Sequence, residues 1–460
     1  MSYNDNSRRG GGFGGRSRGR GGRGGGRSYS GGRGGYGGGG GGGGAHGLGS
    51  EICRRHLDGK CDFEASSNGR PCRFPHFVQK IGEARGHSGA VKDVAIWAAR
   101  QQLFTCAVDA TIKWWDCVSW AEITTISVAD SAGGSSSSSA SSAVGSGGFG
   151  SASSSRSGGG GAGGGGGGGK EKGEGIGAMV LAGPFLFAGF EGPFPFNRQL
   201  PVGMIRGWHL ENQQQPPYEF RVSDSLPFAH SQGVLSLTVA TDAAGNATLF
   251  SGGSDGLIRY WQLDAATNEF KCRGTLEGHV RGVTRLKTFV VGAASILASA
   301  SMDTTIRLWD LSTNQCVKVL GADENGHTNA VMDLEFWVNQ GETFLISGGL
   351  DSEIIVWSLA PPLQQLFKET QDNPVTALCG TQDAAQTPVL LVGTSDGAIT
   401  VKELPSFAYK TTLSAAANVG HQDAVRRLAI GPLNTFFSVG NDRKMLAWQI
   451  TGDSAAIQSK

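Results

Sequence analysis

The sequence predicts an all-β fold built from seven similar units, each with about four short strands. The first observation behind this prediction is that the chain repeats itself from residue 86 onward, at intervals of about 40 residues. The second is that five copies of the repeat place an Asp six positions before a Trp. The third is that 76 of the 460 residues are Gly, so much of the chain cannot form packed core and the folded part must be smaller than the full length.

The five clear copies open with a His and close with a Trp. They begin with the segments GHSGAV, AHSQGV, GHVRGV, GHTNAV and GHQDAV. Their Asp and Trp pairs are Asp109 and Trp115, Asp255 and Trp261, Asp303 and Trp309, Asp351 and Trp357, and Asp442 and Trp448. Between these positions, runs of β-branched and aromatic residues are broken by Gly, Asp and Ser, which indicates short strands joined by tight turns.

Two further copies keep only part of the pattern. One retains Asp396 but has Pro374 near its start and Lys402 in the position of the Trp. The other has Glu191 in the position of the Asp and reaches Trp208 only after a Pro-rich insertion. With these two, the sequence contains seven copies.

These repeats resemble the WD40 family, whose members fold as β-propellers with four strands in each blade. The resemblance covers residues 77–460 and implies a seven-bladed propeller over residues 78–460. Such a ring needs one strand from the other end of the chain, and we predict that residues 77–83 complete the last blade. Residues 131–175 are mainly Ser and Gly, so we expect a disordered loop insertion there.

Each clear copy also has a hydroxyl residue four positions before its Asp. These hydroxyl residues are Thr105, Ser251, Ser299, Ser347 and Ser438, and the histidines are His87, His230, His279, His327 and His421. A hydrolytic triad uses the same residue types, but an active site is needed once, whereas a stabilising network is needed in every blade. We expect the Asp to accept from the His ring and the Trp indole to donate to the hydroxyl. The resemblance implies that this network fastens the loop before a blade to the blade's third strand.

The two incomplete copies predict a second and a sixth blade without this network, where we expect a binding surface or a looser structure. The insertion PFPFNRQLPV interrupts the second blade. Its Phe194, Phe196 and Leu200 could form a contact patch for a partner. The alternative is a plain loop that packs on its own blade.

A cluster of possible metal ligands precedes the repeats, in the segment CRRHLDGKCDFEASSNGRPCRFPH. Cys53, Cys61, Cys72 and His76 would fill the four tetrahedral positions of one Zn²⁺ and leave none for a catalytic water, so the predicted metal role is structural. His56 is a rival ligand. The alternative is that the three cysteines are unrelated and bind no metal.

This segment resembles the CCCH zinc finger family, with GKC at residues 59–61, basic and aromatic residues around the ligands, and ASSNGRP as an inserted loop. Residues 51–77 would form the finger. The family binds single-stranded RNA, which implies base stacking and phosphate contacts here. The matching residues are Phe63, Phe74 and Phe77 for stacking and Arg54, Arg55, Lys60, Arg70 and Arg73 for phosphates. The alternative for the phenylalanines is packing over the zinc or against the propeller, which we expect for Phe77.

Residues 1–50 form a Gly-rich basic tail with eight Arg and one acidic residue, a net charge of +7. Such a segment cannot bury enough apolar surface to fold, so we expect disorder. Its Arg-Gly-Gly triplets begin at Arg9, Arg20, Arg23 and Arg33. Guanidinium groups on a glycine backbone can stack on bases and pair with phosphates of RNA. The alternative is a solubilising or condensate-forming tail.

The net charge of each segment and the positions of the cysteines limit the compartments and partners that we expect. The whole chain has a net charge of +1 and residues 51–80 carry +2, so residues 81–460 carry −8, and nucleic acid would be drawn to the basic front. No apolar run is long enough for a membrane span, and the N-terminus lacks the apolar stretch of a signal peptide. Five cysteines are scattered singly, which argues against a framework of disulfides. We expect an intracellular protein that is neither secreted nor in a membrane, in the nucleus or in nucleus and cytoplasm.

A CCCH finger followed by seven WD40 repeats resembles the zinc finger and WD repeat proteins of plants. The resemblance implies a zinc-dependent RNA-binding adaptor whose propeller docks protein partners. The alternative is an interaction scaffold or a ubiquitin-ligase substrate receptor with a purely structural finger, although WDCV and WDLS lack the Arg typical of such receptors. With no phosphate loop, open metal site or unrepeated nucleophile, we expect neither an enzyme nor a small-molecule substrate.

Overall fold

The computed structural model describes residues 77–128, 175–194, 197–212, 214–242, 244–291, 294–415 and 419–451, without the side chains of residues 193–200. The predicted finger up to residue 76, the basic tail and most of the Ser/Gly insertion lie outside this part of the chain. In the described part, the helical pieces are two single turns, η1 (Ala98–Arg100) and η2 (Ala322–Glu324). Neither has the length and apolar character that crossing a membrane requires.

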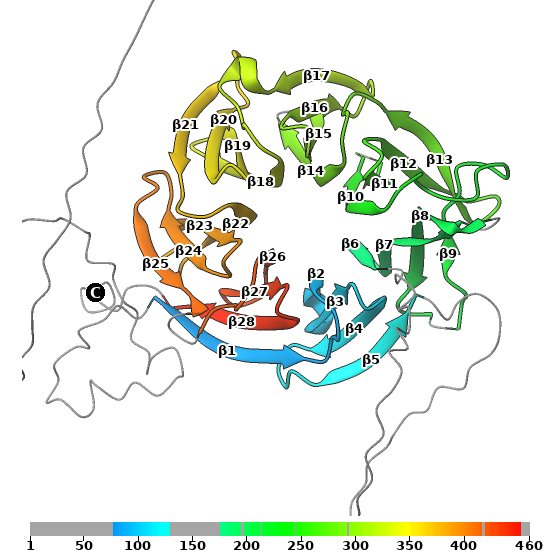
Figure 1. Ribbon diagram of the computed structural model, residues 1–460, viewed down its shortest axis with the longest axis horizontal. Coiled ribbons are helices and arrows are strands. Elements are labelled where there is room, and N and C mark those ends of the chain that lie inside the picture. The colour runs from blue at the N-terminus through cyan, green and yellow to red at the C-terminus, as the bar shows by residue number, and fades with distance from the viewer. Residues whose placement is uncertain are drawn as a thin grey trace, which may run out of the picture. The chain divides into compact units, whose positions relative to one another are not determined.

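Seven sheets of four antiparallel strands form a ring, which confirms the predicted seven-bladed propeller (Figure 1). The first three blades consist of β2 (Val91–Trp97), β3 (Gln102–Ala107), β4 (Thr111–Asp116) and β5 (Glu122–Ser127); of β6 (Ile176–Ala182), β7 (Phe185–Phe194), β8 (Asn197–His209) and β9 (Tyr218–Glu219); and of β10 (Val234–Thr241), β11 (Ala247–Gly253), β12 (Ile258–Asp264) and β13 (Glu269–Leu276).

The remaining four blades follow the same order from the central channel to the rim (Figure 1). They consist of β14 (Val283–Val291), β15 (Ala294–Ser301), β16 (Ile306–Asp310) and β17 (Gln315–Leu320); of β18 (Val331–Asn339), β19 (Glu342–Gly349), β20 (Glu353–Ser358) and β21 (Gln365–Thr370); of β22 (Val375–Gln382), β23 (Pro388–Thr394), β24 (Ile399–Glu403) and β25 (Tyr409–Leu413); and of β26 (Val425–Ile430), β27 (Thr435–Gly440), β28 (Lys444–Ile450) and β1 (Val78–Arg85).

The seventh blade takes its outer strand from the front of the chain, as predicted from residues 77–83. β1 pairs antiparallel with β28 from Val78 opposite Ile450 to Arg85 opposite Lys444. The backbone N–H of Thr451 donates to the carbonyl of Phe77 at 2.9 Å. The two ends of the described propeller are therefore joined by strand pairing, which closes the ring without a covalent link.

The hydrophobic core is divided among the seven junctions between neighbouring blades. Each described cluster of buried apolar side chains combines residues from two adjacent blades, such as Phe104 of the first with Met179 of the second. The cluster that contains Trp115 and Phe437 joins the first blade to the seventh. Because every junction is filled, each blade depends on both neighbours for burial of its two faces.

The turn between the second and third strands has the same backbone shape in six blades. The residue after the Asp has a positive φ in each case: Ala110, Gly256, Thr304, Ser352, Gly397 and Arg443. Only two of these are Gly, and the left-handed region costs other residues about 1–2 kcal/mol. The Asp offsets this cost by accepting N–H groups of its own turn, as Asp303 Oδ1 does from Thr305 at 3.0 Å.

Candidate functional site

Five blades contain the predicted network of His, hydroxyl, Asp and Trp. In the fourth blade, His279 Nδ1 lies 2.9 Å from Asp303 Oδ2 and His279 Nε2 lies 2.8 Å from Ser299 Oγ. Trp309 Nε1 donates to the same Ser299 Oγ at 2.9 Å. The first, third, fifth and seventh blades repeat these contacts within 2.8–3.1 Å.

The network is closed to any substrate. All five hydroxyl residues are 0% exposed, and both ring nitrogens of each His already have partners within the blade. A nucleophilic Ser must reach a substrate carbonyl, which a fully buried hydroxyl with two partners cannot do. The geometry therefore supports the structural role and not the hydrolytic one.

The Asp residues of the network are held ionised. Burial alone would raise the pKa of Asp351, but hydrogen bonds from His327 and from the N–H groups of Thr328 and Glu353 outweigh it and lower the pKa to about 2. The pKa values of the other four are lowered against the same effect of burial, again chiefly by the paired His; they are Asp109, Asp255, Asp303 and Asp442. An ionised Asp needs a donor from Nδ1, which leaves Nε2 of the ring to accept from the hydroxyl.

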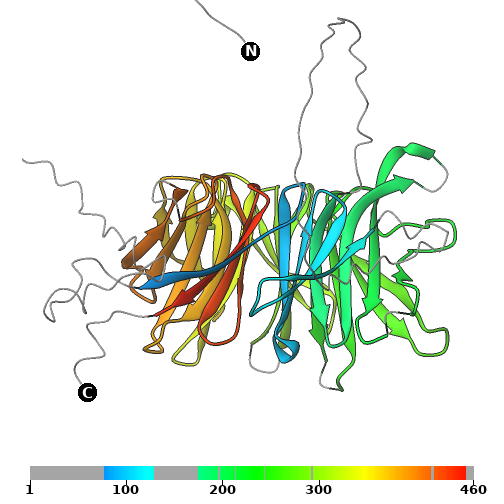
Figure 2. The same cartoon turned by 90° about the horizontal axis from the view of Figure 1, so that it is seen from below.

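The network supports one end of the ring, which we call the network face. The His loops and the Asp turns meet there, and Figure 2 shows the ring from the side with its turns at two ends. Val108, Met302 and Leu350 each precede a network Asp and are 37–43% exposed, and Val280 follows His279 and is 83% exposed. Apolar side chains on rigid turns form a surface suited to a protein partner.

The second and sixth blades lack the network and use other contacts in the described residues, as predicted. In the second blade, buried Arg206 donates to Val128 O and, at 3.2 Å, to Glu219 Oε1. In the sixth blade, Lys402 replaces the Trp, and its Nζ lies 2.8 Å from Glu369 Oε1 of the fifth blade. A charged group thus links neighbouring elements in each, while in the sixth blade the entering loop is joined to the Asp turn by Asn373 Nδ2, which donates to Asp396 Oδ2 at 3.1 Å.

A charged network crosses the central channel, and sequence reasoning missed it. Arg427 of β26 donates from Nε to Asp93 Oδ1 at 3.0 Å and from Nη1 to Asp333 Oδ2 at 3.4 Å. Arg285 Nε lies 2.8 Å from Asp333 Oδ1. These side chains start from the first strands of four blades, which surround the channel (Figure 1). The ring is therefore held across its centre as well as around its rim.

The same two carboxylates also hold two further blades. Asp93 Oδ2 accepts from Met179 N of the second blade, and Asp333 Oδ2 accepts from Leu378 N of the sixth, both at 3.0 Å. Burial would raise the pKa of Asp333, but Arg285 and Arg427 outweigh it and the pKa is lowered. Six blades thus share one ionised network.

The repeat pattern contained a signal for this channel network. Six positions after the His, the five clear copies have Asp93, Ser236, Arg285, Asp333 and Arg427. Charges of both signs therefore occupy one repeat position on the first strand of the blades. Comparing charge at aligned positions would have indicated that these side chains meet, because equivalent positions in a ring of blades face the same axis.

The predicted ligands and RNA contacts lie outside the described residues. They are the metal ligands Cys53, Cys61, Cys72 and His76, the finger residues Phe63, Phe74, Arg54, Arg55, Lys60, Arg70 and Arg73, and the tail residues Arg9, Arg20, Arg23 and Arg33. The side chains of Phe194, Phe196 and Leu200 are also outside.

Phe77 is described and packs in the propeller. It is 1% exposed and belongs to the core cluster that contains Trp448 and Ile450. The expectation that Phe77 packs against the propeller is confirmed. A base-stacking role for it is wrong, because its phenyl side chain is buried and has no face open to RNA.

The five described cysteines are free thiols: Cys106, Cys117, Cys272, Cys316 and Cys379. Burial raises the pKa of the Cys379 thiol to about 12 and that of Cys117 to about 11. A thiol is a metal ligand or nucleophile only as the thiolate. Neither of these two thiols is therefore activated as a nucleophile by its surroundings.

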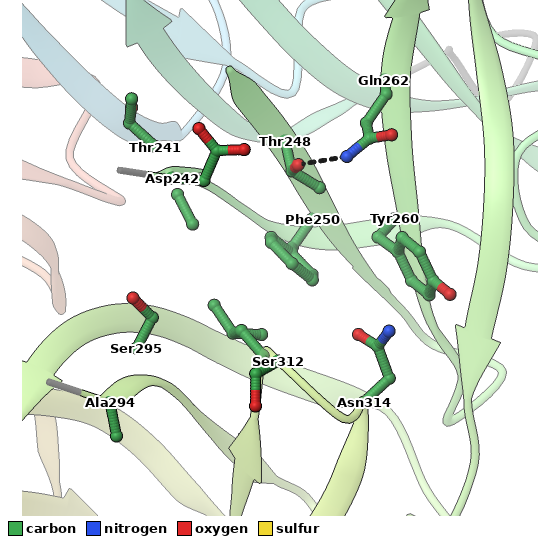
Figure 3. A pocket seen from close by; sticks show the side chains of 12 residues that line it. Thr241, Asp242, Thr248, Phe250, Tyr260, Gln262, Ala294, Ser295, Ser312 and Asn314 are labelled. Atoms are coloured by element: carbon green, nitrogen blue, oxygen red, sulfur yellow. Dashed lines mark hydrogen bonds between the residues drawn. The ribbon is translucent and has the colours of Figure 1, made fainter. Parts of the chain in front are cut away.

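A cavity of about 520 Å³ lies between the third and fourth blades, at the end opposite the network face. Figure 3 shows Phe250, Tyr260 and Asp242 around it, with Gln262 Nε2 donating to Thr248 Oγ1 at 2.9 Å. None of the described residues that line it is Lys or Arg. Its one charge is a carboxylate, so the cavity offers nothing to the phosphates of RNA.

A model of the WD40 family, described as WD domain, G-beta repeat, matches residues 78–116, 270–310 and 314–358. Each match begins at or near the start of the fourth strand of one blade and ends with the third strand of the next, as from β1 to β4. The propeller is built from WD40 repeats. The offset between a WD40 repeat and a blade explains why the last blade must borrow β1.

Relatives of this WD40-repeat chain align with most of its length. Zinc finger CCCH domain-containing protein 17 of Oryza sativa subsp. japonica is 29% identical over 415 residues, which cover 88% of this chain and 74% of the relative. Zinc finger CCCH domain-containing proteins 59 and 48 of Arabidopsis thaliana are 27% and 26% identical, over 87% and 89% of this chain and 67% and 76% of their own. In each case the aligned share of this chain is larger than the share that residues 78–460 make up. The similarity therefore extends beyond the WD40 propeller, toward the N-terminal side.

Proposed function

We propose that this chain is a zinc-containing, RNA-binding adaptor without enzymatic activity, whose propeller docks protein partners. Cys53, Cys61, Cys72 and His76 would hold one structural Zn²⁺, since three thiolates and one imidazole complete a closed tetrahedral site. The names of the similar rice and Arabidopsis proteins, which include a CCCH zinc finger domain, support this ligand set.

The finger and the basic tail would contact single-stranded RNA together. The finger offers Phe63 and Phe74 for stacking and Arg54, Arg55, Lys60, Arg70 and Arg73 for phosphates. The tail adds guanidinium groups at Arg9, Arg20, Arg23 and Arg33. A tail with a net charge of +7 also raises the rate at which RNA is captured.

The observation that carries the proposal is that the described propeller begins at the residue after the predicted ligand His76. Phe77 follows the ligand His76 directly and is locked in the core of the seventh blade. A finger whose last ligand is His76 would therefore follow the propeller core without an intervening linker sequence. That arrangement favours an adaptor that keeps RNA and a protein partner at a set separation.

The propeller half of the proposal relies on the network face. Its exposed Val108, Val280, Met302 and Leu350 stand on turns that the network holds rigid. The scaffold alternative, with a purely structural finger, would use the same face. The adaptor and the scaffold therefore differ only in whether the full chain binds RNA.

We also propose a nuclear location, because an RNA-binding adaptor would meet nascent RNA there.

The test is ultraviolet crosslinking of the full chain to RNA in cells, with zinc measured on the same purified protein. We expect one zinc per chain and efficient crosslinking in the wild type. Cys72→Ser should remove the zinc and weaken crosslinking, deletion of residues 1–50 should weaken it without loss of zinc, and the combination should abolish it.

Cys117→Ser is the matched control, because it removes a thiol outside the predicted ligand set and should keep the zinc. Retention of zinc in Cys72→Ser would rule out the ligand set. Zinc without any crosslinking would favour the scaffold, and a fluorescent fusion confined to the cytoplasm would contradict the nuclear location.

A further inference from the structure

A polar groove of about 250 Å³ runs along the rim of the seventh blade. β1 contributes Lys80, Glu83 and Arg85 to it, and β28 contributes Lys444. β1 is the outermost strand of that blade (Figure 1). Three cationic side chains therefore surround one carboxylate.

The carboxylate is shared by two of the cations. Lys80 Nζ lies 2.7 Å from Glu83 Oε2, and Arg85 Nε donates to Glu83 Oε1. Burial would raise the pKa of Glu83, but hydrogen bonds from Lys80 and Arg85 outweigh it and the pKa is lowered. Glu83 is thus ionised and cancels one of the three positive charges.

The third cation, Lys444, lies opposite another positive side chain in the strand pairing. Arg85 and Lys444 are direct partners in the pairing of β1 with β28. Like charges at directly opposite positions of a sheet are destabilising. Within the described part of the chain, Lys444 Nζ has no ion-pair partner. With three cations and one carboxylate, the groove is positive on a body, residues 81–460, whose net charge is −8.

The groove begins a few residues after the predicted finger in the sequence. Lys80 is four residues after His76, a distance of at most about 14 Å along an extended chain. β1 then leads along the rim from Lys80 to Arg85, over a length of about 17 Å. A strand of RNA that leaves the finger can therefore follow β1 directly.

We propose that this groove holds backbone phosphates of the single-stranded RNA whose bases the finger binds. The inference rests on the proposed function and extends its binding site onto the propeller. The residues that line the groove include no aromatic ring for stacking. Its volume is also below the roughly 300–1,000 Å³ of pockets that enclose a whole small molecule. It therefore binds the charge of the backbone and reads no sequence.

The experiment measures binding of a labelled 20-nucleotide polyuridine to the full chain at several salt concentrations. Each phosphate contact on a single strand contributes about 0.7 to the slope of log Kd against log salt. Lys80→Ala with Lys444→Ala should weaken binding several-fold at low salt and make the slope shallower by about 1.4. Glu83→Gln should act in the opposite direction and tighten binding, since it removes the competing carboxylate.

Lys318→Ala with Lys368→Ala is the matched control. Both are lysines on outer strands of other blades, β17 and β21, each paired with a Glu at 2.6–2.8 Å. This control should leave affinity and slope unchanged, and a Cys72→Ser variant should still respond to salt through the groove.

The outcomes separate the groove from the proposed function. Wild-type protein that fails to bind polyuridine contradicts the RNA function itself. Wild-type binding with an unchanged slope in the Lys80 and Lys444 variant overturns the groove and leaves the finger and tail as the RNA site. A labelled polyglutamate peptide that binds through Lys80 while polyuridine binding does not need it would make the groove a site for acidic peptides.

Discussion

A single hydroxyl oxygen connects two buried rings in each blade that has the network. Ser299 Oγ lies 2.8 Å from His279 Nε2 and 2.9 Å from Trp309 Nε1. The oxygen accepts from the indole and donates to the imidazole Nε2, so it is used both as an acceptor and as a donor. Because none of these atoms reaches water, the loss of the oxygen cannot be compensated by solvent.

Ser299→Ala should lower the free energy of unfolding by about 2–4 kcal/mol, since it leaves an indole N–H and an imidazole nitrogen buried without a partner. Urea unfolding followed by tryptophan fluorescence measures this loss. Ser312→Ala, at an exposed turn, should cost less than about 0.5 kcal/mol. Equal losses in the two variants would show that the buried oxygen has no special role.

The stability of the propeller should fall as the pH falls, in two windows. The pKa of His230 is lowered by burial, so between about pH 6.5 and its folded pKa the unfolded chain binds a proton that the folded chain does not. The five network Asp residues also have lowered pKa values, so their stabilisation is present above about pH 4 and is lost as the pH falls toward their folded pKa values.

Urea midpoints at pH 7.5, 5.5 and 4.0 check this prediction. We expect a modest decrease between the first two values and a steep one below pH 4. A midpoint that rises on acidification would contradict the sign of both shifts.

At the scale of the strand, β1 is the element on which closure of the ring depends. Its first residue Val78, with Phe77 just before it, packs in the junction between the sixth and seventh blades, and Ala84 packs in the junction with the first blade. Gly82 is required within it, because a Cβ there would lie 2.3 Å from the ring of Trp120. One strand thus seals two of the seven junctions.

Phe77→Ala should cost about 3–5 kcal/mol, the range for a fully buried Phe, and should open the ring at the seventh blade. Hydrogen exchange measured by mass spectrometry should then show faster exchange in β28 than in β16. Val319→Ala, at a 38% exposed position on the outer strand β17, is the control and should change little. Uniform exchange across all blades would mean that β1 does not act as the closing element.

At this scale, sequence reasoning was accurate where the repeat was intact. Residues 77–83 were predicted as the closing strand and the structure has Val78–Arg85. The sequence indicated that blades two and six lack the network but not what replaces it. Arg206 and Lys402 find partners in other strands and blades, and those pairings depend on register across elements that the sequence does not specify.

Across the whole molecule, the channel network couples blades that are far apart in the chain. Arg427 and Asp93 are separated by 334 positions and are both largely buried. Burial raises the cost of leaving either charge without its partner. The channel network therefore favours the closed seven-bladed ring over rings that place these residues apart.

Arg427→Met should destabilise the protein by about 3–5 kcal/mol, because Asp93 and Asp333 would remain buried with fewer cationic partners. The measurement is urea unfolding at pH 7.5. Arg426→Met, at the adjacent residue, is the control, since Arg426 is half-buried and, among the described residues, its side chain donates to Asn441 Oδ1 and takes no part in the channel network. A smaller loss in Arg427→Met than in Arg426→Met would show that the channel network does not stabilise the ring.

The sequence by itself determined the number of blades, the network within five of them and the strand that closes the ring. These follow from the number of repeats, from residues at fixed spacings within a repeat, and from the segment that precedes the first repeat. Only the tertiary structure decided which charges meet across the channel and that Arg85 lies opposite Lys444 in the pairing of β1 with β28. Those contacts join positions hundreds of residues apart. They depend on the curvature that brings the ends of the chain together, which is a property of seven packed blades and not of any one repeat.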